Sequence, residues 1–119
     1  MPVRRGEIYW VDFGIPKGSE QGGRRPALII QNDTGNNSSS TTIIAAITSK
    51  KKKAYPFHVE VSASESGLSE DGTVLLEQVF TIDQSRLIER IGSLSSARMT
   101  EVNKALQVSL GLPPSLRLT

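Results

Sequence analysis

The succession of short strand-like segments is the feature that most constrains the fold of this chain. Residues 26–31 and 42–48 are continuous apolar runs, which are typical of buried strands. Residues 58–61 alternate between polar and apolar side chains, as a half-exposed strand does. Further segments rich in β-branched or aromatic residues cover residues 7–13, 73–76, 79–83 and 87–91. Because residues 73–76 and 79–83 are either one bent strand or two strands, the sequence predicts about six short strands.

Loop-forming residues separate the predicted strands. Residues 17–23 contain three glycines together with polar residues, and residues 32–40 are rich in asparagine, serine and glycine. Residues 62–72 are polar as well. We expect loops in all three places, because these residue types favour turns over continuous strands or helices.

Helical spacing occurs only near the end of the chain. Ser95 or Ser96 can cap the start of a helix there, and Gly111 can end it. Apolar side chains recur about every 3.6 residues at Met99, Val102, Leu106 and Leu110. We therefore expect one domain over residues 1–112, mainly β with one C-terminal helix packed on a small β-barrel or strongly twisted sheet, and a short tail over residues 113–119.

The composition excludes several classes of protein. The 119 residues suffice for one domain of ordinary size. No cysteine is present, which excludes disulfides, a thiol nucleophile and a cysteine-based zinc site. No apolar run approaches the roughly 20 residues that span a bilayer, and no apolar segment typical of a signal peptide follows the basic start. We expect a cytoplasmic protein that does not enter a membrane.

Charge is distributed unevenly along the chain. Residues 1–58 carry nine Lys or Arg and four acidic residues, whereas residues 59–119 carry five and eight. The first half is therefore at +5 and the second at −3, within a net charge of +2. A basic first half suits a polyanion such as nucleic acid, and ordinary solvated surface charge is the alternative.

The segment that ends in Arg25 and Pro26 is the first candidate site. The adjacent Gly22 and Gly23 let backbone N–H groups approach an anion closely. Pro26 holds Arg25 extended, and a guanidinium fixed in this way can bind a phosphate through two parallel hydrogen bonds. The alternative is an exposed turn with two surface arginines.

A hydroxyl and a run of lysines form the second candidate site. Thr48 ends a predicted strand, where its hydroxyl can donate a hydrogen bond to a developing charge. Four lysines follow at residues 50–53 and would raise the affinity for a polyanion in a salt-dependent way. The alternative is a polar strand terminus followed by a solvated loop.

Two further stretches combine side chains that can contact nucleic acid. Tyr55, Phe57 and His58 bring together aromatic and basic groups, as at sites where single-stranded bases stack. Glu77 and Gln78 are a polar pair within an apolar strand and suit contacts to base edges. For His58 the alternative is a purely structural role. For Glu77 and Gln78 the alternative is a bend or bulge in the strand.

Several chemistries lack the residues that they need. The chain has one histidine, and it contains no H-E-x-x-H motif, no phosphate-binding P-loop and no nucleophile elbow. Its acidic residues form no compact pair for a magnesium ion. The chemistry that remains needs neither metal nor cofactor. RNA cleavage is such a reaction, because the ribose 2′-hydroxyl is an internal nucleophile. An enzyme then has to orient that oxygen, move protons on and off, and stabilise the pentacoordinate phosphorane.

Motifs run in unbroken order over about residues 4–111. They are R-G-E-I-Y-W-V-D at residues 5–12, G-S-E-Q-G-G-x-R-P at 18–26, Q-N-D at 31–33, I-A-A-I-T at 44–48, H-V-E at 58–60, L-L-E-Q at 75–78 and T-I-D at 81–83. Together they resemble the MazF/PemK-like toxins of type II toxin–antitoxin systems. The resemblance implies an SH3-like β-barrel with an appended helix, assembled as a homodimer.

The resemblance also implies an activity. Members of this family are mostly sequence-specific endoribonucleases, which cut single-stranded mRNA without a metal ion or cofactor. They leave a 2′,3′-cyclic phosphate or 3′-phosphate and a 5′-hydroxyl, and thereby inhibit translation and growth. A cognate antitoxin neutralises them, partly by covering the RNA groove.

Residue by residue, the resemblance places the site. The family's catalytic arginine falls on Arg25, which is expected to contact the scissile phosphate and take part in proton transfer. A guanidinium has a pKa above about 12, so charge stabilisation is the part of this role that chemistry favours. The catalytic threonine falls on Thr48, which is expected to donate to a phosphorane oxygen. RNA-contacting positions fall on Arg5, Ser19, Glu20, Gln21, His58, Glu77, Gln78, Thr81 and Arg86.

Two departures from the family affect RNA recognition. Phe80 stands where many relatives carry an arginine, which replaces a phosphate or base contact with a stacking surface. The loop over residues 49–57 is rich in lysine, and its length varies among relatives. The recognition sequence of a relative therefore does not carry over to this chain.

Two other functions are compatible with the sequence. A barrel that binds RNA or a protein without catalysis would account for the basic first half of the chain. A toxin directed at DNA gyrase is the second, because a related barrel fold does that work and a fold does not determine a function.

Overall fold

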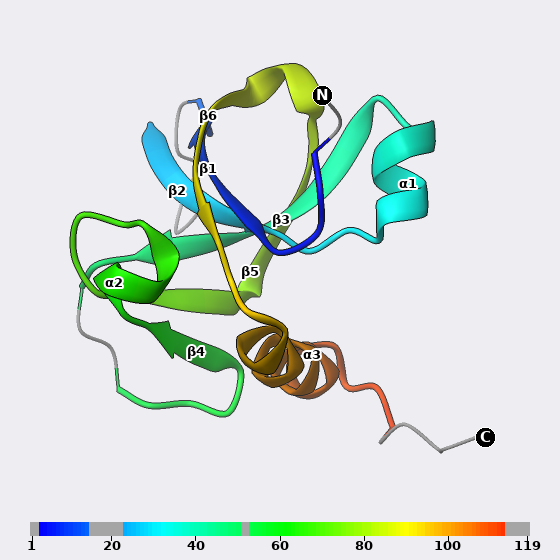
Figure 1. The fold of residues 1–119 in the computed structure, drawn as a ribbon. Helices are drawn as coiled ribbons and strands as arrows, with labels where there is room; N and C mark the ends of the chain where they lie inside the picture. The colour runs from blue at the N-terminus through cyan, green and yellow to red at the C-terminus, as the bar shows by residue number, and fades with distance from the viewer. Residues whose placement is uncertain (1–2, 15–22, 51–52, 114–119) are drawn as a thin grey trace.

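The computed structural model describes residues 3–14, 23–50 and 53–113 (Figure 1). Within these residues six strands form one antiparallel sheet in the order β4-β5-β3-β2-β1-β6. The strands are β1 (Glu7–Asp12), β2 (Arg24–Ile29), β3 (Thr41–Thr48), β4 (His58–Val61), β5 (Gly72–Asp83) and β6 (Leu87–Ser93). The helices are α1 (Asp33–Ser38), α2 (Ala63–Ser66), the 3-10 helix η1 (Gln84–Arg86) and α3 (Ser96–Leu110).

The sheet curves strongly at one end. Figure 1 shows β6 and the end of β5 arching beside β1, so that these strands outline an open ring. The edge strands β4 and β6 do not pair with each other within the described ranges, so the sheet is not closed into a barrel. The prediction of a mainly β fold with one C-terminal helix is confirmed, whereas the predicted closure of the strands into a barrel is not seen. In the part of the chain that the structure describes, no helix is both long and apolar enough to cross a membrane.

Two clusters of apolar side chains bury opposite faces of the sheet, which explains the continuous apolar runs of β2 and β3. The helix-side cluster lies beneath α3 and is built on Ile8, Leu28, Ile30, Ala45, Ile47, Val59, Val61, Val74, Leu76, Leu94, Val102 and Ala105. The ring-side cluster is built on Val3, Val11, Ala27, Ile29, Ile44 and Ile82. Leu28 and Ile29 therefore serve different clusters, as neighbours on a strand must.

Residues 73–83 form one bent strand, which is the first of the two alternatives that the sequence left. In β5, Leu75 pairs with Ala46 of β3, whereas Val79 pairs with the next residue, Ala45. The residues between Leu75 and Val79 therefore bulge from the ladder, and Glu77 lies within this bulge. A bulge bends a strand and redirects its side chains.

The prediction of loops at residues 32–40 and 62–72 was wrong in part, because each contains a short helix. Helix α1 begins after Asn32, whose side chain accepts a hydrogen bond from the backbone N–H of Gly35. Helix α2 begins with a capping box between Ser62 and Glu65. Both helices are held by local caps and are too short to show helical periodicity. Strand β2 also begins earlier than predicted, because Arg24 and Arg25 already pair with β1.

Helix α2 packs on β6 through a close approach of two backbones. A Cβ atom built on Gly92 would overlap the carbonyl oxygen of Ser66. A Cβ on Gly67, which has a φ of +86°, would lie 2.6 Å from the carbonyl oxygen of Ile91. Only glycine fits at these two positions, so the segment that follows α2 is held directly against β6.

Ser95 caps α3, which resolves the choice between Ser95 and Ser96. Its hydroxyl accepts a hydrogen bond from the backbone N–H of Arg98, and Gly111 ends the helix in the left-handed conformation. We expect Ser95→Ala to lower the free energy of unfolding by about 1 kcal/mol, because it removes a side-chain cap. Ser96→Ala is the matched control and should change stability by less than about 0.5 kcal/mol. Urea unfolding checks both, and equal effects of the two substitutions would contradict the assignment of the cap.

Glu65 links α2 to α3. Its carboxylate accepts hydrogen bonds from the backbone N–H of Ser62 at 2.8 Å and from Nε of Arg98 at 3.0 Å. These two donors, the Ser62 N–H first, hold the pKa of Glu65 below its usual value. The contribution of Glu65 to stability is thus fully present above the pKa of the unfolded chain and is lost as pH falls through the lower folded-state pKa.

This link predicts how stability depends on pH. Between about pH 6 and pH 3, wild type should lose more free energy of unfolding than Glu65→Gln, by about 1 kcal/mol or less for an ion pair near the surface. Urea unfolding at a series of pH values measures the difference. Glu89→Gln on β6 is the control, and it should follow wild type. Parallel acid profiles for wild type and Glu65→Gln would refute the role given to this carboxylate.

Candidate functional site

The pairing of β2 with β3 brings Arg25 and Thr48 to one face of the sheet. Ala27 lies opposite Ala46 in this ladder. The paired residues of β2 in this ladder are 27–29, and extending the same register by two residues would set Arg25 opposite Thr48. Residues two apart on a strand point to the same side, so both side chains lie on the face of the ring-side cluster. Val11 of β1 pairs with Arg25 from the other side and belongs to that cluster.

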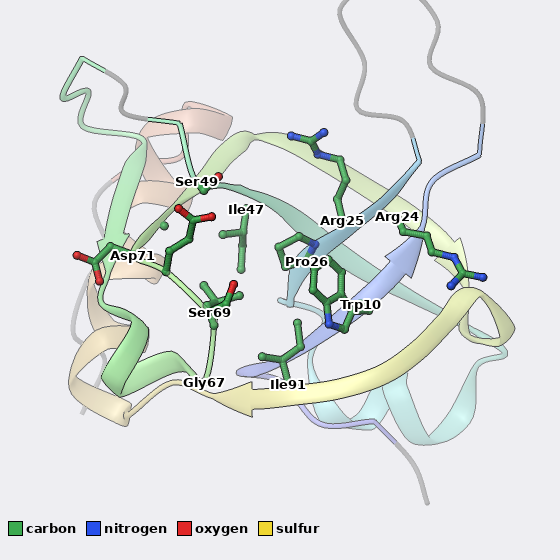
Figure 2. Close-up of a pocket in the computed structure, with 13 residues that line it drawn as sticks. Trp10, Arg24, Arg25, Pro26, Ile47, Ser49, Gly67, Ser69, Asp71 and Ile91 are labelled. Atoms are coloured by element: carbon green, nitrogen blue, oxygen red, sulfur yellow. The ribbon is translucent and has the colours of Figure 1, made fainter.

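Arg25 is partly buried and carries an unused hydrogen-bond donor. Its Nε is buried and has no hydrogen-bond partner among the described residues. A buried donor without a partner costs about 1–3 kcal/mol, so the guanidinium gains from an acceptor such as a phosphate oxygen. Figure 2 shows the Arg25 side chain leaving β2 in a different direction from that of its neighbour Arg24. The two arginines therefore do not act as one surface pair.

Thr48 is 3% exposed, so a ligand meets only a small part of its side chain. Its Oγ1 accepts a hydrogen bond from the backbone N–H of Lys50 at 3.2 Å. Because the oxygen is the acceptor in that bond, the hydroxyl keeps its own hydrogen for donation elsewhere. Thr48 also pairs with Thr73 of β5, which continues the polar row across the sheet from Arg25.

A cavity of about 390 Å³ opens beside Arg25 (Figure 2). Trp10, Pro26 and Ile91 are among its apolar walls, and Arg24 and Arg25 line one side. The segment after α2 lines the other side with Ser69, Glu70 and Asp71. Thr48 does not line this cavity, whereas Ile47, which belongs to the helix-side cluster, does. The cavity therefore reaches the face of the sheet opposite to the one that Arg25 and Thr48 share. Sequence patterns gave no sign of this cavity, whose walls come together only through the strand register and the seating of α2.

His58 and Glu77, both predicted to contact RNA, lie against each other. Nε2 of His58 is 3.1 Å from each carboxylate oxygen of Glu77. Glu77 reaches β4 because it lies in the bulge of β5. Gln78, from the same bulge, has a buried Oε1 without a hydrogen-bond partner among the described residues.

The remaining predicted contacts are scattered. Arg5 is already engaged, since its Nε donates to the carbonyl oxygen of Ile30 at 2.8 Å and its Nη2 to Oδ1 of Asn103 at 2.8 Å. Thr81 and Arg86 are exposed. Ser19, Glu20 and Gln21 lie outside the described residues, as do two of the four lysines at residues 50–53.

Phe80, expected as a stacking surface, is partly buried. Its ring meets that of Phe13 edge to face, with 5.4 Å between centroids, and packs against the ring-side cluster. Phe80 therefore packs among the apolar side chains at the curved end of the sheet. In the described residues no three side chains of His, Asp or Glu come together as metal ligands would.

Comparisons with known proteins place the chain in a family. A family model described as PemK-like, MazF-like toxin of type II toxin–antitoxin system matches residues 4–110. The chain is 51% identical over 111 residues to the endoribonuclease MazF of Staphylococcus saprophyticus, covering 92% of each protein. It therefore belongs to the family of PemK-like, MazF-like toxins of type II toxin–antitoxin systems, as the sequence motifs predicted.

Solved structures of the same kind are similar to this fold. One is MazF from Deinococcus radiodurans, with a TM-score of 0.79 and 30% identity, covering 93% of this chain and 98% of that one. Another is an endoribonuclease in complex with its cognate antitoxin from a mycobacterial species, with a TM-score of 0.79 and 26% identity, covering 93% and 97%.

Trp10 can report the binding of an anion at Arg25. It is the only tryptophan, it is 39% exposed and it lines the same cavity. At constant ionic strength, inorganic phosphate should change its fluorescence, and Arg25→Gln should weaken the apparent affinity by about tenfold or more, because a hydrogen bond to a charged group contributes about 1.5–3 kcal/mol. Arg90→Gln, which alters an arginine paired with Glu7, is the control. A titration that Arg25→Gln leaves unchanged would show that Arg25 does not hold the anion.

Proposed function

We propose that this toxin is a sequence-specific endoribonuclease that cuts single-stranded mRNA without a metal ion, with Arg25 and Thr48 as its catalytic pair. It would leave a 2′,3′-cyclic phosphate or 3′-phosphate and a 5′-hydroxyl, and so inhibit translation and growth. The observation that supports the proposal is the register of β2 on β3, which would set Arg25 opposite Thr48 if extended by two residues, in a chain that is 51% identical to an endoribonuclease MazF.

The reaction uses a nucleophile that the substrate itself supplies. The ribose 2′-oxygen attacks the adjacent phosphorus as its proton leaves, and a pentacoordinate phosphorane forms. The bond between phosphorus and the 5′-oxygen then breaks, and the 5′-oxygen takes up a proton. Negative charge grows on the non-bridging oxygens during these steps, so hydrogen-bond donors fixed in advance lower the barrier most.

Arg25 and Thr48 supply such donors from two strands. Nε of Arg25 has no partner among the described residues, and a guanidinium matches the geometry of a phosphate, so Arg25 suits the scissile phosphate. Thr48 keeps a free hydroxyl hydrogen because its oxygen already accepts from Lys50. Arg25 thus stabilises the negative charge on the non-bridging oxygens, and Thr48 donates a hydrogen bond to a phosphorane oxygen.

Other features of the family belong to the same proposal. The curved sheet would complete an SH3-like barrel, two copies would form a homodimer in the cytoplasm, and a cognate antitoxin would neutralise it. Support for the antitoxin comes from similar structures that hold one, including MazE-MazF of Deinococcus radiodurans. RNA contacts are proposed at Arg5, Ser19, Glu20, Gln21, His58, Glu77, Gln78, Thr81 and Arg86.

Cleavage of single-stranded RNA in the presence of EDTA tests the proposal. Arg25→Ala and Thr48→Val should each lower the rate by about 100–1000-fold, as removal of one transition-state donor does. Thr48→Ser keeps a hydroxyl and should be closer to wild type than Thr48→Val. Arg90→Ala, on the edge strand β6, should cut RNA at the wild-type rate.

The products give a second readout. The downstream fragments should accept a phosphate from polynucleotide kinase without prior dephosphorylation, because their 5′ ends carry a hydroxyl. Full activity in both Arg25→Ala and Thr48→Val would remove the catalytic assignment. Stable RNA binding by wild type without any product would instead favour a non-catalytic RNA-binding protein.

A further inference from the structure

The corner between β5 and β6 carries η1, the 3-10 helix that ends in Arg86. Arg86 is one of the residues proposed above to contact RNA. The helix has only three residues, and the Asp83 carboxylate caps it by accepting a hydrogen bond from the backbone N–H of Ser85 at 2.8 Å. Because so short a helix has little stability of its own, its orientation depends on what holds it to the rest of the protein.

The first residue of η1, Gln84, ties this corner to the end of α1. Its side-chain Nε2 donates to the backbone carbonyl oxygens of Asn36 at 3.0 Å, Ser39 at 3.1 Å and Thr41 at 3.1 Å. The backbone N–H of Gln84 donates to the carbonyl oxygen of Ser40 at 2.9 Å. These oxygens lie at the end of α1 and in the turn that leads to β3, where a helix leaves carbonyl groups without partners of its own. One residue thus holds η1 by its side chain and its backbone.

At the other end of η1, the exposed Arg86 reaches the base of the β1–β2 hairpin. A Cβ atom built on Gly14 would lie 3.0 Å from Nη2 of Arg86, so the guanidinium lies close to this glycine. The carbonyl oxygen of Gly14 accepts a hydrogen bond from the backbone N–H of Gly23 at 2.7 Å, which joins the two sides of the hairpin at this point. Arg86 therefore meets the hairpin immediately before Arg24 and Arg25.

Strand register brings Arg86 near the proposed catalytic arginine. Leu87, the residue after Arg86, pairs with Val11 of β1, and Val11 pairs with Arg25 of β2. Two strand spacings separate Leu87 from Arg25, which sets their backbones about 10 Å apart. Leu87 and Val11 both pack in the ring-side cluster, so this row lies on the face that Arg25 shares. The long side chain of Arg86 is thus placed to meet a phosphate next to the one at Arg25.

We infer that Gln84 is a positioning residue for RNA binding. Its hydrogen bonds to the end of α1 hold η1 in place, and η1 keeps the Arg86 guanidinium at the base of the hairpin, where it binds a phosphate beside the cleaved one. Holding the backbone of Arg86 in advance reduces the ordering that RNA binding has to impose. This inference rests on the proposed function. The alternative is that Gln84 only stabilises the fold.

Gln31 offers a matched control, because it makes the same kind of hydrogen bond to the same turn. Its Nε2 donates to the carbonyl oxygen of Thr41 at 3.0 Å and to Oδ1 of Asn36 at 2.9 Å. Gln31 has no part in η1. Gln31→Met and Gln84→Met therefore both remove a side-chain amide from the end of α1, and only Gln84→Met releases the helix that carries Arg86.

Binding of a short 2′-O-methyl RNA, which cannot be cleaved, tests this role over a series of salt concentrations. Arg86→Ala should reduce the slope of log K against log salt by about 0.7, the value for one phosphate contact on a single strand. Gln84→Met should weaken binding by about two- to tenfold, and by nothing further once Arg86 is alanine. Gln31→Met should bind RNA as wild type does. In cleavage, Gln84→Met should raise KM while kcat stays close to wild type, because Arg25 and Thr48 are untouched.

Two substitutions of Asp83 release η1 by a second route. Asp83→Ala and Asp83→Asn remove the same charge, but asparagine still caps a helix and alanine does not. Asp83→Ala should therefore bind RNA more weakly than Asp83→Asn, and Arg86→Ala should abolish the difference. Asp83 is exposed, so both variants are expected to fold, and they decide the question if Gln84→Met does not. Circular dichroism shows whether each variant is folded.

The outcomes separate this inference from the proposed function. Independent effects of Gln84→Met and Arg86→Ala, or equal losses of RNA affinity in Gln84→Met and Gln31→Met, would overturn the positioning role and leave the enzyme assignment standing. Wild-type affinity and slope in Arg86→Ala would do the same. If wild type neither binds nor cuts RNA, the proposed function fails, and the inference fails with it.

Discussion

One ladder of backbone hydrogen bonds, between β2 and β3, determines where both halves of the proposed catalytic pair lie. Arg25 and Thr48 are distant in the sequence and share a face only in this register. A slip by one residue would turn one of them to the opposite side of the sheet. Such a slip is strongly disfavoured because Leu28 and Ile29 are both fully buried, in clusters on opposite faces. Burial on both sides of β2 therefore determines the strand register, and with it the face of the sheet on which Arg25 and Thr48 lie.

Three buried polar atoms among the residues that the structure describes are not satisfied by the fold itself. Nε of Arg25 is a donor without an acceptor, and Nδ1 of His58 and Oε1 of Gln78 have no hydrogen-bond partner. Buried polar groups in folded proteins are nearly always paired, so such atoms call for an explanation. A free donor such as Nε of Arg25 suits a phosphate oxygen.

The sequence predicted most of the strands and α3 because their periodicity reflects burial over many residues. It did not predict α1 and α2, which depend on single caps at Asn32 and Ser62. It offered a bend or bulge at Glu77 and Gln78 as an alternative, which the structure confirms, but it did not predict the contact between Glu77 and His58. Arg25 and Thr48 were identified by family motifs, and their catalytic roles stay a prediction. The cavity beside Trp10 could not be predicted, because its walls come from segments that only the strand register and the packing of α2 bring together.

The contact between α2 and β6 has a consequence for how the cavity beside Arg25 can vary. Gly67 and Gly92 press two backbones together, and the segment that immediately follows Gly67 forms one wall of that cavity. The backbone of this wall is therefore held against β6 by main-chain geometry, whichever side chains the wall carries. Substitutions at Ser69 or Glu70 can exchange the groups presented to a ligand while the backbone behind them stays in place.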